Sequence, residues 1–281
     1  MNLEKALNKA SKILFKNHIK TSLLDSEILI AKAISKDRRF ILSNLNKEID
    51  IDSLNYFQNL ISQRASGRPI SYITEIKDFW KFQFKIIDGV LIPRPDTEII
   101  IEEALKITKN KKKIKILDIG VGSGCIILSL LKERKDFKGI GIDLSKKCID
   151  LSRLNALRLD IKNRVKFFKS DVDNFNYGKY DLIISNPPYI KKLDLKYLEK
   201  DIINFEPKIA LNGGLDGLSE IRKIINRSSE LIKKGGKLIL EIAFDQKKEV
   251  KELLIKNGFY INSVVKDFGK NDRCIVSTKN S

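Results

Sequence analysis

From residue 114 onward, short apolar runs alternate with amphipathic stretches, and this alternation limits the possible folds more than any other feature. Short apolar runs bounded by turn residues favour buried strands, and the longer stretches have helical spacing. A chain that alternates in this way builds a parallel sheet with helices on both faces. The predicted strands are 114–119, 139–143, 165–169, 182–185, 237–242, 260–266 and 274–277, and the predicted helices between them are 125–133, 146–160, 218–231 and 246–257. Because only a brief connection joins the last two strands, we predict an α/β fold with a seven-stranded, mostly parallel, doubly wound sheet closed by one antiparallel strand.

The first of these strands ends in a glycine-rich turn, Gly120-Val121-Gly122-Ser123-Gly124, that leads into a helix. Open α/β sheets bind nucleotides at such a turn because glycines let a ligand lie against the bare backbone. The dinucleotide fingerprint G-x-G-x-x-G requires a third glycine at position 125, which is Cys125. The turn also lacks the Gly-Lys-Ser/Thr of a phosphate loop. This spacing favours S-adenosylmethionine, an adenosine that carries a sulfonium and an amino acid and needs no phosphate cradle.

Two acidic residues follow the next two predicted strands. Asp143, which lies 19 residues after Gly124, can accept hydrogen bonds from both ribose hydroxyls. Asp171 could reach the adenine amine, and Val172 could flank the adenine ring. A single acidic residue at such a place is more often a cap or a loop residue. The carboxyl ends of parallel strands share one edge of a sheet, however, so a bound ligand would bring these residues together.

The fourth predicted strand ends in a stiff polar corner, Asn186-Pro187-Pro188-Tyr189. The prolines cannot donate to a sheet ladder, and they leave Asn186 with a side-chain acceptor beside unpaired carbonyl groups and a flat tyrosine ring. Two acceptors aimed at the N–H groups of an amide would orient it and oppose the delocalisation of its nitrogen lone pair. A bare Pro-Pro is more often only a turn. Together with the glycine turn, the corner predicts a site for a planar amide or an exocyclic amine.

The N-terminal part reads as a small helical domain, 1–76, with helices at 3–14, 22–34, 38–45 and 52–66, Ser22 as one cap and Asp52 as the start of the last helix. Period-two alternation at Trp80, Phe82 and Phe84 then predicts a β-hairpin over 77–92, with Asp88-Gly89 as its turn and 90–92 as its return strand.

The remaining part, 93–281, which contains the predicted S-adenosylmethionine site, begins with a stiff lead-in to a helix at 99–107. Its prolines fix the backbone, and Asp96 or Thr97 can cap the helix. Arg94 has no role in such a lead-in.

Composition excludes several classes. The 281 residues contain no run of about 18 apolar residues and no signal segment, so we expect a soluble, cytoplasmic protein. Three scattered cysteines and one histidine predict neither a disulfide framework nor a metal site. The net charge of +18 comes from 42 Lys and 12 Arg against 36 acidic residues, and is spread along the chain as a coding bias toward A and T would spread it. The charge therefore says little about the reaction.

The chain resembles the peptide chain release factor glutamine methyltransferases, the PrmC/HemK family, which have a Rossmann-like class I methyltransferase fold. The likeness rests on these segments: Gly67-Arg68-Pro69, Tyr72-Ile73, Asp78-Phe79-Trp80, Leu91 to Glu98, the glycine turn, Ser185 to Ile190, Phe205-Glu206-Pro207, Ala210-Leu211, Asp216-Gly217-Leu218 and Asp272-Arg273. The resemblance implies methyl transfer from S-adenosylmethionine to the side-chain amide nitrogen (N5) of the glutamine in the Gly-Gly-Gln motif of class I release factors. It also implies that the helical domain docks the release factor. We further expect a monomer that does not bind nucleic acid in a sequence-specific way and does not associate with a membrane.

Carried over to this sequence, the resemblance assigns the cofactor to Gly120, Val121, Gly122, Ser123, Gly124, Asp143, Asp171, Val172 and Asn186, and the glutamine to Asn186, Pro187, Pro188 and Tyr189. Two departures bear on the cofactor, because Val172 stands where such enzymes often have an aromatic residue and Ala243 where the family usually has glycine. The alternatives are a methyltransferase for a ribosomal-protein glutamine, a DNA amino-methyltransferase and a non-catalytic basic protein. The first is expected to differ at Pro95 to Glu98. The second usually has a sizeable target-reading domain, for which residues 1–80, with 13 basic and 9 acidic side chains, are a poor candidate.

Overall fold

The computed structural model describes residues 1–280 and divides into two compact units. The first, here called the helical unit, comprises Met1–Ile76 and Glu199–Phe205. The second, the sheet unit, comprises Lys77–Leu198 and the residues from Glu206 onward. The chain therefore leaves the sheet unit once, between residues 198 and 206, and returns to it.

The helical unit contains six helices within the described residues: α1 (Leu3–Lys16), α2 (Ser22–Ala33), α3 (Arg38–Ser43), α4 (Ile51–Ala65), α5 (Ile70–Thr74) and α9 (Lys200–Phe205). Leu3, Leu7 and Leu14 follow one face of α1 and are buried in its core. A buried ion pair joins two of the helices, because Arg64 Nε donates to Asp25 Oδ2 at 2.7 Å. Two details of the sequence prediction are wrong here: Asp50, not Asp52, caps α4 by accepting from Ser53 N, and Ser22 lies inside α2. A fifth, short helix, α5, follows Pro69.

The sheet unit is built on seven strands in the order β5-β4-β3-β6-β7-β9-β8. Their bounds are β3 Lys115–Ile119, β4 Lys138–Asp143, β5 Val165–Lys169, β6 Tyr180–Ser185, β7 Ile232–Glu241, β8 Phe259–Lys266 and β9 Asp272–Lys279. Only β9 runs antiparallel to its neighbours, β7 and β8. The predicted seven-stranded, mostly parallel fold is confirmed.

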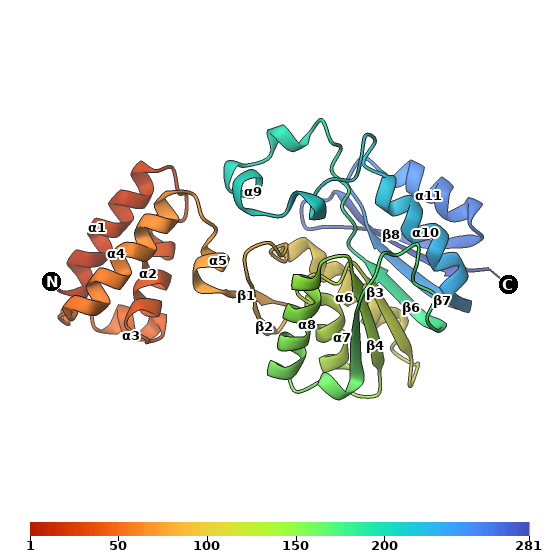
Figure 1. Cartoon of the computed structure of the whole chain (residues 1–281), viewed down its shortest axis with the longest axis horizontal. Helices are drawn as coiled ribbons and strands as arrows, with labels where there is room; N and C mark the ends of the chain where they lie inside the picture. Colours follow the sequence, from red (N-terminus) through yellow and green to blue (C-terminus); the bar gives the residue numbers. More distant parts are fainter. Residues whose placement is uncertain (281) are drawn as a thin grey trace. The chain divides into compact units, whose positions relative to one another are not determined.

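Helices cover both faces of this sheet (Figure 1). The helices α6 (Glu98–Ile107), α7 (Cys125–Glu133) and α8 (Lys146–Arg158) pack on one face. The helices α10 (Ser219–Leu231) and α11 (Lys247–Lys256) pack on the other, where Leu117, Ile183 and Leu238 join their apolar residues in one core. Strand side chains alternate between the faces, so neighbours of Leu117 such as Asp118 face the other helix layer.

The β-hairpin differs from its prediction. Its strands are β1 (Ile76–Phe79) and β2 (Phe82–Lys85), so the turn falls at Trp80-Lys81 rather than at Asp88-Gly89, and residues 90–92 form no strand. Trp80 adopts a positive φ of 57°, which a bulky residue rarely does. Two hydrogen bonds hold it there, from Trp80 N to Glu98 Oε1 and from its indole Nε1 to Glu133 Oε1, both at 2.8 Å. These partners are distant in sequence and outweigh the local turn signal.

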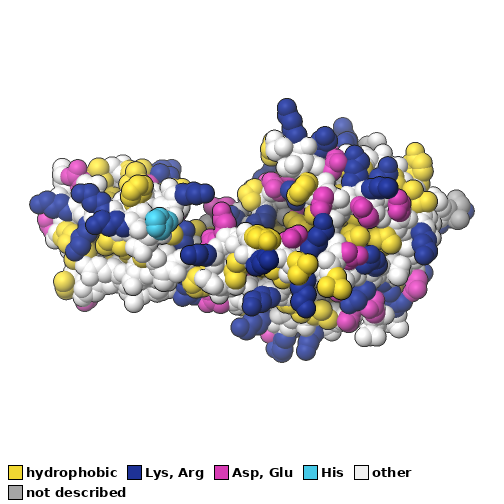
Figure 2. Space-filling model, turned by 90° about the horizontal axis from the view of Figure 1, so that it is seen from above, with side chains coloured by type: hydrophobic (Ala, Val, Ile, Leu, Met, Phe, Trp, Pro, Cys, Tyr) yellow, Lys and Arg dark blue, Asp and Glu magenta, His cyan; other side chains and the backbone are white. Residues whose placement is uncertain are grey.

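Lysine and arginine side chains are scattered over the visible faces of both units instead of forming one patch (Figure 2). This distribution agrees with a charge that is spread along the sequence. No helix in the described part of the chain is long and apolar enough to cross a membrane.

Candidate active site

The register of the sheet places three predicted site residues in one row with a fourth residue, Glu241. Ile142 of β4 pairs with Ile119 of β3, and Ile119 pairs with Ser185 of β6. Ser185 in turn pairs with Leu240 of β7. The next residue on each strand is therefore, in order across the sheet, Asp143, Gly120, Asn186 and Glu241. These four residues lie side by side at the carboxyl edge, where open α/β sheets bind ligands.

The glycine turn is held in place by backbone and side-chain contacts. Gly120 N and Val121 N both donate to Ile142 O at 2.9 Å. From α8, Ser152 Oγ donates to Gly122 O and Asn155 Nδ2 to Ser123 O, both at 2.9 Å. The turn is thus rigid before any ligand binds.

Open space lies beside the glycine turn. Gly120 and Gly122 have φ values of +75° and +55°, and a Cβ added to either would meet no atom within 4 Å. A Cβ on Gly124, by contrast, would approach Leu128 Cδ1 to 2.8 Å. The first two glycines therefore leave room for a ligand against the backbone, and the third allows α7 and the turn to pack closely.

Asp118, near the end of β3, has an unpaired carboxyl group beneath this turn. Asp118 is 1% exposed, and neither of its carboxyl oxygens, Oδ1 and Oδ2, has a hydrogen-bond partner within residues 1–280. Burial raises the pKa of Asp118 to about 8; the nearby backbone N–H of Ile127 opposes this rise, and the negative charge of Asp143 adds to it. Ser123 Oγ is also buried without a partner. Unpaired acceptors beside an open glycine turn fit a ligand that carries positive charge, as the sulfonium and ammonium groups of S-adenosylmethionine do.

The other predicted cofactor residues lie at the same edge. Asp143 Oδ2 accepts from Gly122 N and its Oδ1 from Ser145 N, both at 2.9 Å, and each oxygen keeps a second lone pair for a ligand. Burial raises the pKa of Asp143. Asp171 is half-buried after β5, where its Oδ1 accepts from Asp173 N. Val172 is buried in the apolar core, so its contact with adenine stays a prediction.

Two side chains of the polar corner make hydrogen bonds below it. Asn186 Nδ2 donates to Thr97 Oγ1 at 3.1 Å, and Tyr189 Oη donates to Glu241 Oε1 at 3.1 Å. Thr97, one of the two predicted capping residues, is the N-cap residue of α6, but its side chain makes no capping hydrogen bond to the helix. Burial raises the pKa of Glu241 to about 7, which the hydroxyl groups of Thr97 and Tyr189 oppose.

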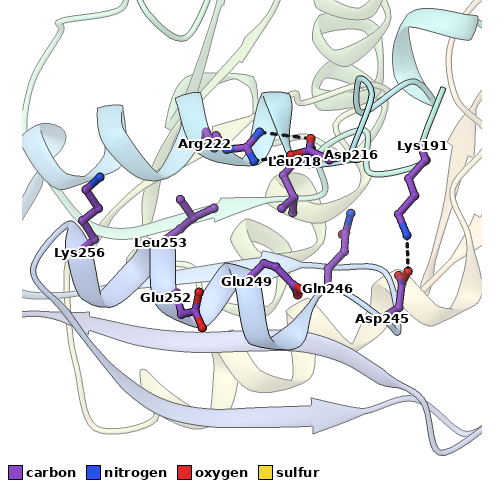
Figure 3. Close-up of a pocket in the computed structure, with 10 residues that line it drawn as sticks. All are labelled: Lys191, Asp216, Leu218, Arg222, Asp245, Gln246, Glu249, Glu252, Leu253 and Lys256. Carbon is purple, nitrogen blue, oxygen red and sulfur yellow. Dashed lines mark hydrogen bonds and ion pairs between the residues drawn. The ribbon is translucent and has the colours of Figure 1, made fainter.

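The main chain of the corner is anchored by Gln246. Its Nε2 donates to Tyr189 O and to Gly217 O, both at 3.0 Å, and its Oε1 accepts from Ala243 N at 3.0 Å. Figure 3 shows Gln246 rising from the start of α11 beside a cavity of about 490 Å³ between α10 and α11. None of the predicted site residues lines this cavity, whose rim carries ion pairs such as Lys191 with Asp245.

The lead-in to α6 is fixed by a buried carboxylate. Glu206 Oε1 accepts from Arg94 Nη2 at 2.6 Å, and its Oε2 accepts from Ile92 N at 3.4 Å. The Glu206 side chain is 2% exposed. This ion pair gives Arg94, which the sequence left without a role, a structural function.

Sequence reasoning missed three residues of this site as functional groups: Asp118, Glu241 and Gln246. Asp118 and Glu241 end or nearly end predicted strands that neighbour the site, which is the signal that could have found them. Gln246 acts through contacts with residues 29 and 57 positions away, and no local pattern marks it.

Comparisons with known proteins agree with this geometry. Residues 5–74 match the family described as PrmC N-terminal domain, and residues 97–214 match the methyltransferase small domain. The release factor glutamine methyltransferase of Clostridium acetobutylicum is 36% identical over 99% of both chains, and that of Buchnera aphidicola is 37% identical, again over 99% of both. A methyltransferase structure from Pyrococcus furiosus superposes with a TM-score of 0.52 at 20% identity, covering 70% of this chain and 89% of the other, and shows the shared fold.

These matches confirm the predicted family and the predicted dependence on S-adenosylmethionine. The relatives span both units, from the first helices to the last strands, so the likeness is not confined to the common methyltransferase sheet. The chain therefore belongs to the family of release factor glutamine methyltransferases.

Proposed function

We propose that this protein methylates the side-chain amide nitrogen of the glutamine in the Gly-Gly-Gln motif of class I peptide chain release factors. The row Asp143, Gly120, Asn186 and Glu241 at one sheet edge is the observation that carries the proposal. It sets a corner suited to a carboxamide directly beside an open glycine turn suited to a cationic nucleoside. The family membership supplies the identity of the substrate.

S-adenosylmethionine supplies an electrophilic methyl group on a sulfonium. Gly120 to Gly124 and Asp143 would hold it, with Asp171 and Val172 toward the adenine. Asn186 Oδ1 and a backbone carbonyl of the corner would accept the two amide N–H bonds of the glutamine, and Tyr189 would flank its side chain. With these contacts in place, the amide nitrogen lone pair faces the methyl group.

The corner acts by orientation. Bound S-adenosylmethionine would supply its methyl group to the amide nitrogen, and its sulfur would keep the electrons of the sulfur–carbon bond that breaks. The methylated nitrogen then carries an acidic extra proton, which water can accept. Alignment of two bound reactants can lower a barrier by roughly 7 to 11 kcal/mol, so no covalent enzyme intermediate is needed.

The decisive experiment supplies labelled S-adenosylmethionine with a purified class I release factor, the same factor with its Gly-Gly-Gln glutamine replaced, a ribosomal-protein substrate and DNA. Label should enter only the unaltered release factor. Label in the ribosomal protein or in DNA instead would replace the proposal by one of those activities.

Asn186→Ala tests the role of the corner. It should leave the fold intact and lower kcat for methylation at least about a hundredfold, as loss of an oriented polar contact can. Asn226→Ala, which removes an exposed asparagine from α10 of the same unit, is the matched control and should keep full activity. Near-normal turnover of Asn186→Ala would remove Asn186 from the mechanism.

A further inference from the structure

A chain of polar contacts runs from the corner into the protein interior. Asn186 Nδ2 donates to Thr97 Oγ1, and the Thr97 hydroxyl is near enough to the carboxylate of Glu241 to lower the pKa of that group. Thr97 is 2% exposed and Glu241 is 1% exposed, so water does not supply alternative partners easily. Glu241 Oε1 already accepts from Tyr189 Oη, whereas Oε2 has no hydrogen-bond partner in the described chain.

The direction of the hydrogen bonds among Asn186, Thr97 and Glu241 decides which way the Asn186 amide points. A hydroxyl has one proton to donate. Beside an ionised carboxylate that proton turns toward the negative charge, because a charge-assisted hydrogen bond is the stronger one. The oxygen of Thr97 is then left as an acceptor, and only the NH₂ end of Asn186 can satisfy it. Asn186 Oδ1 must face the opposite way, and it accepts no hydrogen bond from residues 1–280.

We propose that ionised Glu241, acting through Thr97, fixes the orientation of the Asn186 carboxamide so that its oxygen faces the substrate amide. This inference rests on the proposed function for its consequence in catalysis. Glu241 and Thr97 are positioning residues, since they touch neither the methyl group nor the glutamine. When Glu241 takes up a proton, the Thr97 hydroxyl is free to donate to Asn186 instead. The Asn186 carboxamide can then reverse, so that its NH₂ group faces the NH₂ group of the substrate amide.

Several groups set the charge of Glu241. Its partners with polar hydrogens are Tyr189 from the corner and Thr97 at the start of α6. Arg273 on β9 favours the ionised form, and Asp96 opposes it. Cys125 on α7 and Cys274 on β9 are close enough to feel its charge, and burial keeps the pKa of both thiols above the ordinary value, so they stay neutral.

Kinetics of three variants test the positioning role. Thr97→Val removes the hydroxyl at similar volume and should lower kcat roughly tenfold to a hundredfold with little change in KM for the release factor. Thr97→Ser keeps the hydroxyl and should retain activity within about threefold. In Glu241→Gln the new amide can donate to Thr97 and so reverse the direction of the hydrogen bonds. Its kcat should therefore fall as in Thr97→Val. Equal activity of Thr97→Val and Thr97→Ser would overturn the proposal.

The pH profile separates positioning from mere structural support. In the wild-type protein kcat should fall as the pH drops through the pKa of Glu241, because protonation releases the amide. In Thr97→Val and Glu241→Gln this limb should disappear. If kcat of both variants still fell over the same acidic pH range as in the wild type, Glu241 would not act on Asn186 through Thr97, even if the rates of the variants were low.

A readout that does not depend on methylation keeps this inference separate from the proposed function. The side-chain NH₂ signals of Asn186, assigned through Asn186→Asp, should shift with pH in the NMR spectrum of the wild type and stay fixed in Thr97→Val. If no release factor is methylated but the signals behave in this way, the proposed function fails and the coupling stands. Signals that titrate equally in both proteins would refute the coupling.

Discussion

Asp118 gives the most quantitative prediction, because its carboxyl is buried without a partner in the cofactor-free protein. Its pKa is about 8 in the folded state, against an ordinary value of 3.8. Between these values the folded state binds more protons than the unfolded state, so stability decreases as the pH rises. From pH 5 to pH 7 the loss from this one group is at most about 3 kcal/mol, at 1.36 kcal/mol per unit of pH.

Asp118→Asn replaces the neutral acid by a neutral amide of the same shape and removes this loss. The variant should gain up to about 3 kcal/mol over the wild type between pH 5 and pH 7, which is roughly 5 to 10 °C in the unfolding midpoint of a unit of this size. Thermal unfolding without cofactor, at both pH values, measures the difference.

Asp216→Asn is the control for this measurement. Its hydrogen bonds with Arg222 lower the pKa of Asp216 to about 2, so it titrates outside the measured range and its variant should keep the wild-type pH dependence. Equal loss of stability in the wild type and Asp118→Asn would refute the reasoning.

Two further predictions use matched pairs. Gly122→Ala and Gly235→Ala both place a Cβ in open space at positive φ, +55° and +70°, so each should lower the free energy of unfolding by about 1–2 kcal/mol. Only Gly122→Ala should weaken S-adenosylmethionine binding, by at least about tenfold in calorimetry. Equal affinities of the two variants would exclude the glycine turn as the cofactor site. Glu206→Gln breaks the buried ion pair with Arg94 and should lower the free energy of unfolding by about 2 kcal/mol in urea, whereas Glu230→Gln, in an exposed pair with Arg227, should cost less than about 0.5 kcal/mol. Similar losses in the last two variants would contradict the role of burial.

Much of the sheet could be predicted because four central strands, β3, β4, β6 and β7, contain apolar runs that stop at a glycine, an aspartate, an asparagine before two prolines, and a glutamate. The same rule put Gly120, Asp143 and Asn186 at one edge, since parallel strands share their carboxyl ends. Errors arose where a distant partner outweighed a local signal. Trp80 accepts a strained turn because Glu98 and Glu133 bind it, and Asp88-Gly89 contributes no hairpin.

The hydrogen bonds that join Asn186 to Thr97 and Tyr189 to Glu241 could not be predicted for the same reason. Thr97 lies 89 residues from Asn186, and its hydroxyl could equally have capped α6. Glu241 lies 52 residues from the tyrosine that binds it. Which acceptor a short polar side chain uses depends on the three-dimensional register of strands and helices, and the sequence pattern carries no record of it.

The position of β9 has a consequence for synthesis on the ribosome. This strand follows β8 in the chain yet lies between β7 and β8 in the sheet. A nascent polypeptide that has emerged only as far as β8 therefore has an unpaired β7 edge, which invites pairing with other chains. Because Glu241 pairs with Cys274, the support beneath the polar corner is also incomplete at that stage. The β7 edge stays unpaired, and the polar corner incompletely supported, until β9 has been synthesised and has inserted between β7 and β8.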